Sequence, residues 1–369
     1  MHSEPLIILV VATALAFDFT NGFHDTANVV ATSISTRAVA PRVAVTIAAI
    51  LNFVGAFISL KVAATIATGI VAAGAITLPV VFAGLIGASV WNLTTWYFGL
   101  PSSSSHALIG GVVGAMIAAK GTGAVQFAGL LGKVIVPAFI SPILAFAIAG
   151  TAIAITYRLT ARLRPGPAGR GFRHGQLFSG GMLALAHGTN DAQKTMGVIT
   201  LALIANGNIS AAHFAVPAWV VISAASAIAL GTYAGGWRII RTLGTRIIKM
   251  DAAQGFTAQT AGAAVVLAAS HVGYPLSTTH VMAGGITGAG AGKRLSAVRW
   301  GMAGNMAIAW LLTLPAAAAV GAGTYAATTT IGNGTLGPFV IAAIALAAIL
   351  SLMVRRAREL TANPADAKQ

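Results

Sequence analysis

The amino-acid sequence predicts an all-α integral membrane protein with about 10–12 transmembrane or re-entrant helices, arranged as two inverted-topology repeats. The composition is 57% hydrophobic and only 8% charged, whereas a soluble domain carries about 25% charged residues. Apolar stretches of about 20 residues, the length of a membrane span, recur along almost the whole chain. Two short polar motifs each occur twice, in the same order. The chain is therefore expected to lie almost entirely in the bilayer.

The expected spans follow the apolar stretches in order. They cover residues 5–36, 43–62, 79–99, 102–119, 124–157, 177–204, 214–234, 255–270, 276–292, 299–323 and 336–354. The first stretch is long enough to contain a break in its helix. The stretches 102–119 and 276–292 are short enough to re-enter the membrane from the side on which they began.

The basic residues predict the orientation. The net charge is +15, and Lys and Arg are concentrated on the cytoplasmic side of membrane proteins. If the N-terminus is outside and the spans alternate, all but four of the 22 Lys and Arg residues fall in inner segments. The exceptions are Lys61, Lys120, Lys133 and Lys194. We expect an outer N-terminus, a cytoplasmic C-terminus and no nucleic-acid partner, because no soluble basic domain is present to bind one.

The segment RLTARLRPGPAGRGFRHG divides the chain near its middle. It is polar, basic and rich in Pro and Gly, which is typical of a loop. The sequence therefore predicts a first membrane repeat over 1–157, a basic cytoplasmic loop over 158–175, a second membrane repeat over 176–335, and an extra span with a cytoplasmic tail over 336–369. The absence of Cys excludes disulfides, thiolate metal sites and Cys nucleophiles.

The repeat is visible in two pairs of motifs. Residues 21–28 are NGFHDTAN and residues 187–194 are HGTNDAQK, with Gly and Asp at matching positions. Residues 101–111 are PSSSSHALIGG and residues 275–285 are PLSTTHVMAGG. The first half contains five expected spans, an odd number, so the second copy must enter the membrane from the opposite side.

Inverted repeats are the architecture of many secondary transporters, whose substrate sites lie near the midplane at breaks in helices. Gly22 and Gly188 mark the expected breaks in one motif pair, and Pro101 and Pro275 mark them in the other. An alternating-access carrier with a central site is therefore predicted, with no enzymatic activity.

Three carboxylates lie in apolar stretches. An ionisable group at bilayer depth costs about 2.5–3.5 kcal/mol or more, so each is a functional candidate. Asp25 and Asp191 occur at matching positions and favour function over a purely structural role. Asp18 has no counterpart in the second half, and a structural role is the favoured interpretation. Asp251 follows a basic segment and is expected to be solvated.

Lys194 occupies the position of Asn28 in the second copy. A buried Lys is unfavourable unless it is paired, and Asp191 lies three residues earlier on the same helical face. We expect Lys194 to face an anion or this carboxylate. The alternative is that its side chain extends to the membrane interface.

Hydroxyl runs follow Pro101 and Pro275. Hydroxyls and free N–H groups at the start of a helix form an anion site, and the alternative is simple N-capping. The next residues, His106 and His280, are candidates for proton relay or for packing. The Gly-Gly pairs that follow are typical of close helix packing in membranes.

These motifs resemble those of a known family. NGFHDTANVVATSISTRA and AHGTNDAQKTMGVIT resemble the paired motifs of the PiT family of inorganic phosphate transporters, and PSSSSHALIGG and PLSTTHVMAGG resemble its second pair. Both copies of the family's first motif are close to G-x-N-D-x-x-N. This chain departs from it with His24 in the first copy and Gln193-Lys194 in the second, which resembles the bacterial low-affinity branch.

The resemblance implies cation-coupled phosphate symport across the bacterial cytoplasmic (inner) membrane. It implies no cofactor beyond the coupling cation, with a proton favoured and sodium as the alternative, and it allows phosphate to travel with a divalent metal. The expected coupling-ion residues are Asp25, Asp191, Asn28 and Asn21. The expected substrate-binding residues are Ser103, Ser104, Ser105, Ser277, Thr278, Thr279, Asn28, Lys194 and Asn190. The sequence leaves the metal and the oligomeric state open, a homodimer included.

The alternatives differ in chemistry. Sulfate stays deprotonated, so a sulfate carrier on the same fold would need donors and no carboxylates, and it is the nearest rival. An intramembrane hydrolase is disfavoured because Ser105 and His106 are adjacent and do not face each other on a helix. A passive channel is disfavoured because paired carboxylates and a Lys suit coupled transport.

Overall fold

The computed structural model describes residues 4–210, 214–332 and 335–362, and these residues are almost wholly helical. The helices of the first half are α1 (Glu4–Ser35), α2 (Pro41–Gly55), α3 (Lys61–Thr68), α4 (Leu78–Phe98), α5 (Ser104–Lys120), α6 (Phe127–Leu130) and α7 (Val136–Thr160). Those of the second half are α8 (Pro165–Ala205), α9 (Ala218–Ala234), α10 (Trp237–Arg241), α11 (Ala252–Val272), α12 (Thr278–Ala291), α13 (Trp300–Ile331) and α14 (Leu336–Ala362). The last expected residues of the tail, 363–369, lie outside the described part.

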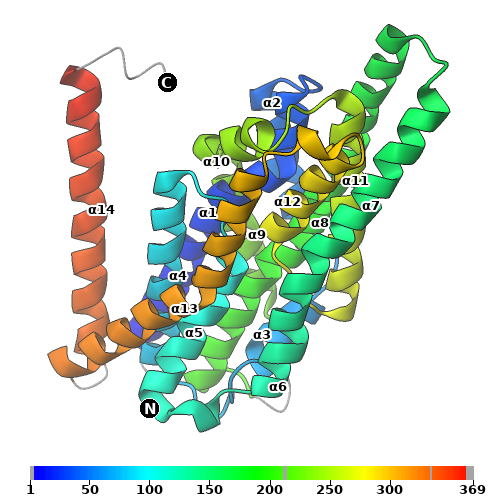
Figure 1. Cartoon of the computed structure of the whole chain (residues 1–369). Helices are drawn as coiled ribbons and strands as arrows, with labels where there is room; N and C mark the ends of the chain where they lie inside the picture. The colour runs from blue at the N-terminus through cyan, green and yellow to red at the C-terminus, as the bar shows by residue number, and fades with distance from the viewer. Residues whose placement is uncertain (1–3, 211–213, 333–334, 363–369) are drawn as a thin grey trace.

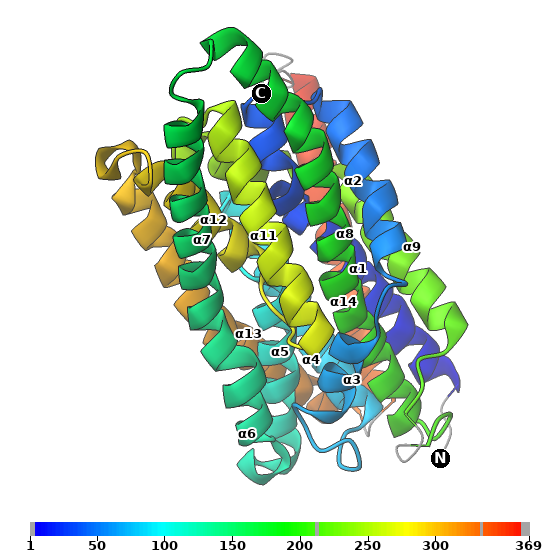
Figure 2. The same cartoon turned by 90° about the vertical axis from the view of Figure 1, so that its right-hand side faces the viewer.

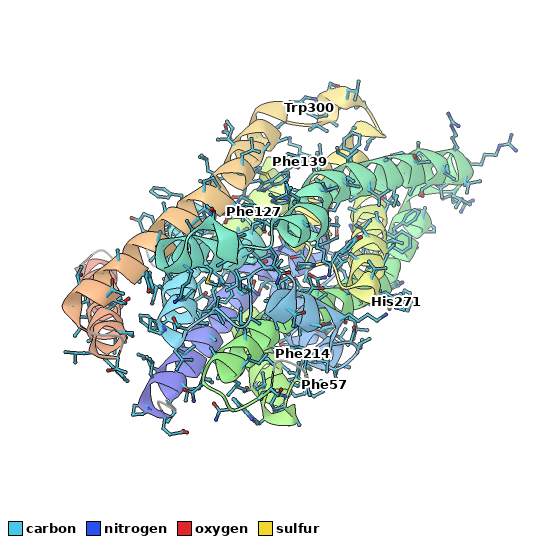
Figure 3. The ribbon with its side chains drawn as sticks, turned by 90° about the horizontal axis from the view of Figure 1, so that it is seen from below. Phe57, Phe127, Phe139, Phe214, His271 and Trp300 are labelled. Atoms are coloured by element: carbon cyan, nitrogen blue, oxygen red, sulfur yellow. The ribbon has the colours of Figure 1, made fainter. Side chains whose placement is uncertain are left out.

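The bundle has the surface of a membrane protein. Four described helical segments are long and apolar enough to cross a bilayer, and α9 with the helix after it forms a fifth that is bent by 61°. Large apolar side chains point outward from the bundle (Figure 3); Phe139, for example, is 56% exposed. Buried polar side chains are instead concentrated in the interior. An apolar exterior, with polar side chains buried inside among the apolar ones, fits a chain that is solvated by lipid, and the predicted all-helical membrane fold is confirmed.

Two helical hairpins position the centre of the molecule. In α4–α5 and in α11–α12, the second helix starts inside the bundle, and α5 and α12 then run toward opposite ends of it (Figure 1). The two inner turns meet there, because Ser105 Oγ donates a hydrogen bond to the carbonyl oxygen of Leu276 at 3.2 Å. Both helices are short, as the sequence predicted, because each begins near the middle of the bundle.

The Gly-Gly motifs hold these short helices against the opposite half. A Cβ atom on Gly110 of α5 would lie 2.5 Å from the Leu314 carbonyl oxygen of α13, and one on Gly284 of α12 would lie 2.3 Å from the Pro142 carbonyl oxygen of α7. Only glycine allows backbones to approach this closely. Each half therefore clamps the short helix of the other, and the predicted packing role of these glycines is confirmed.

The expected breaks at Gly22 and Gly188 are wrong. Both α1 and α8 continue through these residues without interruption. The glycines serve close packing instead: a Cβ on Gly22 would lie 2.3 Å from the Ile228 carbonyl oxygen of α9, and one on Gly188 would lie 2.1 Å from the Asn52 carbonyl oxygen of α2. The breaks expected after Pro101 and Pro275 are present, just before α5 and α12.

The central segment also differs from the prediction of a loop. Helix α7 continues to Thr160 and α8 begins at Pro165, so 161–164 is the only non-helical part of this segment. Proline is compatible with the first turn of a helix, because the N–H that it lacks would have no partner there. Two further differences concern short helices: the expected span 43–62 divides into α2 and α3, and α10 with the π-helical turn Thr242–Arg246 was not predicted.

The helix ends separate into two groups along the bundle axis. The start of α1 lies at one end, and the end of α14 lies at the other (Figure 1). The α7–α8 connection, which is one of the basic segments, lies at the same end as the end of α14 (Figures 1 and 2). The bundle therefore has a basic end opposite to the start of α1.

Candidate functional site

The four sequence motifs converge at the centre of the bundle. Helices α1 and α8 contribute Asp25 and Asp191, and the first turns of α5 and α12 contribute the hydroxyl runs. The two carboxylates are 1% and 0% exposed. Both side chains are therefore shut off from solvent in this structure.

Asp25 is held mainly by groups of its own half, although Thr279 Oγ1 of the other half also lies 3.5 Å from its Oδ1. Its Oδ2 accepts a hydrogen bond from Ser104 Oγ at 2.6 Å, and its Oδ1 lies 2.6 Å from His24 Nδ1. The other ring nitrogen of His24 lies 3.2 Å from Thr95 Oγ1 on α4. The first hairpin therefore orients the imidazole that faces this carboxylate. The sequence alone indicated no role for His24. Its role in facing Asp25 is seen only from this contact.

Asp191 is paired with a Lys and a His. Its Oδ1 lies 2.7 Å from Lys194 Nζ, and its Oδ2 lies 3.3 Å from His187 Nε2. Lys194 Nζ also donates hydrogen bonds to Ser105 Oγ and to the Leu276 carbonyl oxygen, the latter at 2.7 Å. An ammonium has three donors, so the ammonium of Lys194 is fully used. It joins the second carboxylate to both hairpin turns, and the interface alternative is excluded because Lys194 is only 2% exposed.

Asn28, which occupies the position of Lys194 in the first half, makes the equivalent contact with the opposite hairpin. Its Nδ2 donates hydrogen bonds to Thr279 Oγ1 at 2.9 Å and to Thr278 Oγ1 at 3.2 Å. Lys194 reaches Ser105 of the first half in the same way. Each half thus places a nitrogen donor on the hydroxyls of the other half, but only one of the two donors carries a charge.

The first turns of α5 and α12 have matching caps. Ser103 Oγ accepts a hydrogen bond from the His106 backbone N–H at 3.1 Å, and Ser277 Oγ accepts one from the His280 backbone N–H at 3.3 Å. The oxygens of these two serines therefore serve as N-caps. The positive ends of two helices point at the centre from opposite sides, which is the geometry of an anion site.

The predicted asparagines occupy the edge of this centre. Asn190 Nδ2 donates hydrogen bonds to Ser270 Oγ at 2.8 Å and to the Tyr274 carbonyl oxygen at 3.1 Å, so it holds the turn of the second hairpin. The side-chain oxygens of Asn190, Asn28 and Asn21 are buried and have no hydrogen-bond partner among the described residues. These oxygens are available to a cation or to a protonated ligand.

Sequence reasoning missed one cluster. Asp25, His187 and Asp191 each offer a ligand atom within 4.8 Å of the others. Carboxylate and imidazole ligands of this kind suit a divalent metal. The spacing of His187 and Asp191, four residues apart on α8, places both on one helical face, and this spacing was the signal in the sequence.

Two other predicted candidates have structural contacts. The rings of His106 and His280 lie 4.8 Å apart, and His280 stacks on Trp310 at 4.2 Å, which favours packing over relay.

Asp251 was expected to be merely solvated, and this is incomplete. It caps α11, accepts a hydrogen bond from the Tyr157 hydroxyl at 2.5 Å and lies 3.0 Å from Lys293 Nζ. Partial burial raises the pKa of Asp251. The contacts with Tyr157, the Gln254 backbone N–H and Lys293 lower it by more, so this pKa lies below its ordinary value.

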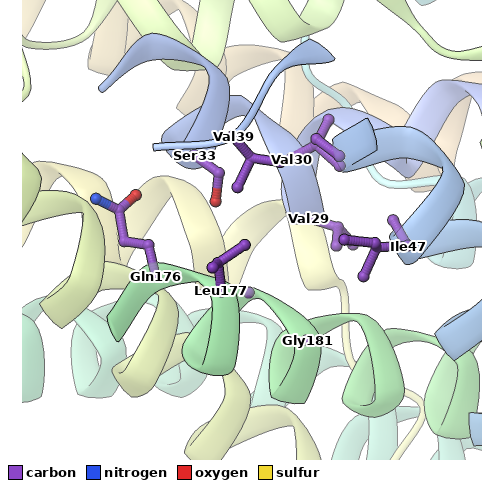
Figure 4. Close-up of a pocket in the computed structure, with 11 residues that line it drawn as sticks. Val29, Val30, Ser33, Val39, Ile47, Gln176, Leu177 and Gly181 are labelled. Carbon is purple, nitrogen blue, oxygen red and sulfur yellow. The ribbon is translucent and has the colours of Figure 1, made fainter. Parts of the chain in front are cut away.

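A small pocket lies away from the centre, between α1, α2 and α8 (Figure 4). Its lining is mostly apolar, with Val30, Ile47 and Leu177 among the side chains, and Ser33 and Gln176 at its polar edge. No ionisable side chain lines it. The pocket does not fit an inorganic anion, so the convergent motifs remain the candidate site.

The comparison with family models agrees with this geometry. The model of the phosphate transporter family matches the chain twice, at residues 21–168 and 162–321. The chain belongs to this family. It is therefore a membrane transporter and not an enzyme, and the resemblance to the PiT family is confirmed. Each match contains one copy of both motifs, so the family repeat coincides with the two clamped hairpins.

Individual relatives support the same assignment. A probable low-affinity inorganic phosphate transporter of Mycobacterium bovis is 55% identical over 87% of this chain and 77% of its own length. Proteins with the same description from Rhizobium meliloti and Bacillus subtilis are 48% and 45% identical, each over 87% of this chain and 96% of their own length. A solved structure described as the sodium-dependent phosphate transporter has a TM-score of 0.81, at 24% identity, over 89% of this chain and 100% of its own. That likeness concerns the fold.

Proposed function

We propose that this protein imports inorganic phosphate by cation symport and alternating access, with a proton as the coupling ion in preference to sodium. The observation that carries this proposal is the convergence of two capped helix starts, their hydroxyls and the Lys194 ammonium on Asp25 and Asp191 in a closed centre. The names of the relatives point to the same substrate.

The carboxylates explain why phosphate transport would require a cation. Phosphate brings negative charge to a centre that already holds Asp25 and Asp191, so an unaccompanied anion is repelled. Helix starts and hydroxyls take the phosphate oxygens, and a bound cation offsets the carboxylates. Phosphate also carries protons of its own that carboxylates can accept, whereas sulfate does not, and this difference favours phosphate.

The contrast between Asn28 and Lys194 favours a proton over sodium. An Asn carbonyl oxygen is a ligand for an alkali cation, and Asn28 Oδ1 has no partner among the described residues. An ammonium at the matching position already supplies a positive charge, bound to Asp191 at 2.7 Å. Lys194 therefore takes the place of one bound sodium in the second half.

The cluster of Asp25, His187 and Asp191 could bind the metal of a metal–phosphate substrate. A divalent metal held by these three residues would supply two positive charges, which offset those of a doubly negative phosphate. The neutral complex would then cross as cargo. The same residues would release it when the site opens to the other side.

The placement in the cell follows from the charges. We assign the basic end of the bundle to the cytoplasm of a bacterium and the start of α1 to the outside, because basic residues are retained on the inner side. The protein is then a multi-pass carrier of the inner membrane with a cytoplasmic C-terminus. A homodimer is compatible with this placement.

Substrate identity is tested with the purified protein in liposomes. Uptake of labelled phosphate should be saturable, should be suppressed by excess unlabelled phosphate and should ignore excess sulfate. Adding a divalent metal should raise the rate if the complex is the cargo. Equal suppression by sulfate would favour the sulfate carrier, and the absence of saturation would favour a channel.

A further inference from the structure

Asp18 is a buried carboxylate for which the described residues provide no ion pair. It lies on α1, seven residues before Asp25, so it is about 10 Å nearer the start of the helix. It is 0% exposed, and neither of its oxygens has a hydrogen-bond partner among the described residues. An ionised carboxylate in this situation is strongly unfavourable unless a cation joins it.

The polar neighbours of Asp18 are a hydroxyl and an amide, and both are neutral. Thr195 on α8 and Asn21 on α1 are the polar side chains beside it. Thr195 Oγ1 and Asn21 Oδ1 are likewise buried and without a partner. The Thr195 hydroxyl and the Asn21 amide therefore approach the carboxylate, but neither brings the positive charge that an ionised Asp18 would need. A protonated carboxyl can donate to either neighbouring oxygen, whereas an ionised one can only accept.

Among the residues that the structure describes, no positive side chain is free to neutralise this carboxylate. The ionisable groups that face Asp18 are Asp191 and Lys194, both on α8. Asp191 adds negative charge, and all three donors of Lys194 are used by Asp191, Ser105 and Leu276. The negative charge of Asp18 is therefore left to an exchangeable cation.

The two halves differ at the position of Asp18. The position of Asp18 corresponds to Ala184 in the second half, which is 1% exposed on the equivalent face of α8. An apolar residue thus fits the equivalent place. The single carboxylate lies on the side of the centre toward the start of α1, which is the outer side in the orientation proposed above.

We propose that Asp18, with Asn21 and Thr195, forms a separate proton-binding site on the outer approach to the phosphate site. The proton comes from the outer solution, is held on the Asp18 carboxyl while phosphate is occluded, and leaves to the inner solution after the site opens inward. This inference rests on the proposed phosphate symport. It assigns one of the coupled protons to a residue that contacts neither hydroxyl run.

The test compares two transport modes of Asp18→Asn, which keeps the shape of a protonated Asp18. Exchange of internal for external phosphate needs no gradient and should continue. Accumulation driven by an inward proton gradient should fall, by about tenfold per pH unit of gradient for each coupled proton that is lost. The fall should be matched by less proton uptake per phosphate, measured with a dye inside the liposomes. Asp251→Asn is the matched control and should accumulate phosphate as the wild type does.

Normal proton-driven accumulation by Asp18→Asn would overturn the inference while leaving phosphate transport intact. A second outcome would also overturn the inference. If a sodium gradient drives accumulation by the wild type and Asp18→Asn abolishes it, the site binds sodium. If neither mode works in the wild type, the proposed function fails instead. If Asp18→Asn also loses phosphate exchange, Asp18→Glu provides the test. Proton-coupled accumulation by Asp18→Glu with a displaced pH dependence supports the inference. An unchanged pH dependence refutes it.

Discussion

Lys194 Nζ lies 2.7 Å from Asp191 Oδ1, three residues away on the same helix. The first half has the neutral Asn28 in place of this Lys. The two copies of the motif therefore have the same geometry but different charge, and most of the functional consequences follow from this difference.

Replacing the ammonium with an amide should change the coupling ion. Lys194→Asn restores in the second half the residue type of Asn28, so phosphate uptake should acquire a dependence on sodium. Loss of the buried partner should also lower stability by about 3–5 kcal/mol, and added sodium should recover part of it. Uptake by the variant in liposomes and its thermal unfolding in detergent measure both effects. The exposed Lys120→Asn is the control. If Lys194→Asn transports as the wild type does, indifferent to sodium, the assigned role is wrong.

The central carboxylates should be indispensable. Asp25→Asn and Asp191→Asn each remove a charge that the coupling cation or metal requires, so accumulation of phosphate should fall to the background of empty liposomes. Asp251→Asn, outside the site, should retain uptake. Wild-type accumulation by either central variant would remove that residue from the coupling site.

Adjacent serines should behave differently. Ser103→Ala removes the cap of α5 and should cost about 1 kcal/mol of stability, which Ser103→Thr should largely preserve. Ser104→Ala removes the donor 2.6 Å from Asp25 and should impair phosphate uptake more than stability. Unfolding temperatures and initial uptake rates, measured on the same preparations, separate the two roles. The reverse ranking would contradict the assignment.

The hairpin clamps should not tolerate a methyl group. In Gly284→Ala the added atom would lie 2.3 Å from the Pro142 carbonyl oxygen, so α7 and α12 must separate, at about 1–3 kcal/mol. Gly301→Ala is the control, because nothing lies within 4 Å of a Cβ there. Thermal unfolding in detergent should be lowered only for the first variant.

The cap of α11 should make stability depend on pH. The pKa of Asp251 is lower in the folded protein than its ordinary value, which is about 3.9. Its contribution is therefore present above that value and is lost as pH falls through the lower folded pKa. Unfolding temperatures below about pH 4 should decline less steeply in Asp251→Asn than in the wild type. Identical profiles would show that this carboxylate contributes nothing.

Much of the fold could be predicted because the apolar stretches are long and their ends are marked. The bounds of α4 and α12 agree with the expected spans 79–99 and 276–292 to within a few residues. The continuity of α1 through Gly22 could not be predicted. A glycine that breaks a helix and a glycine that allows a neighbouring backbone to approach look the same in a sequence. Only the approach of Ile228 distinguishes them.

The meeting of the motifs in the candidate site was predictable where they repeat. The matching Asp25 and Asp191 and the hydroxyl runs meet as expected, because symmetry requires related motifs to face one axis. The contact of Asp25 with His24 and the approach of His187 to Asp191 are asymmetric. They depend on side-chain directions set by Thr95 and Asn52 of other helices, which no local pattern contains.

The most direct test of the account is phosphate uptake by the purified protein in sodium-free liposomes under an imposed inward proton gradient. Labelled phosphate should accumulate above its external concentration, and a protonophore should abolish this accumulation. Equilibration without accumulation, or accumulation only after sodium is added, would contradict proton-coupled phosphate symport.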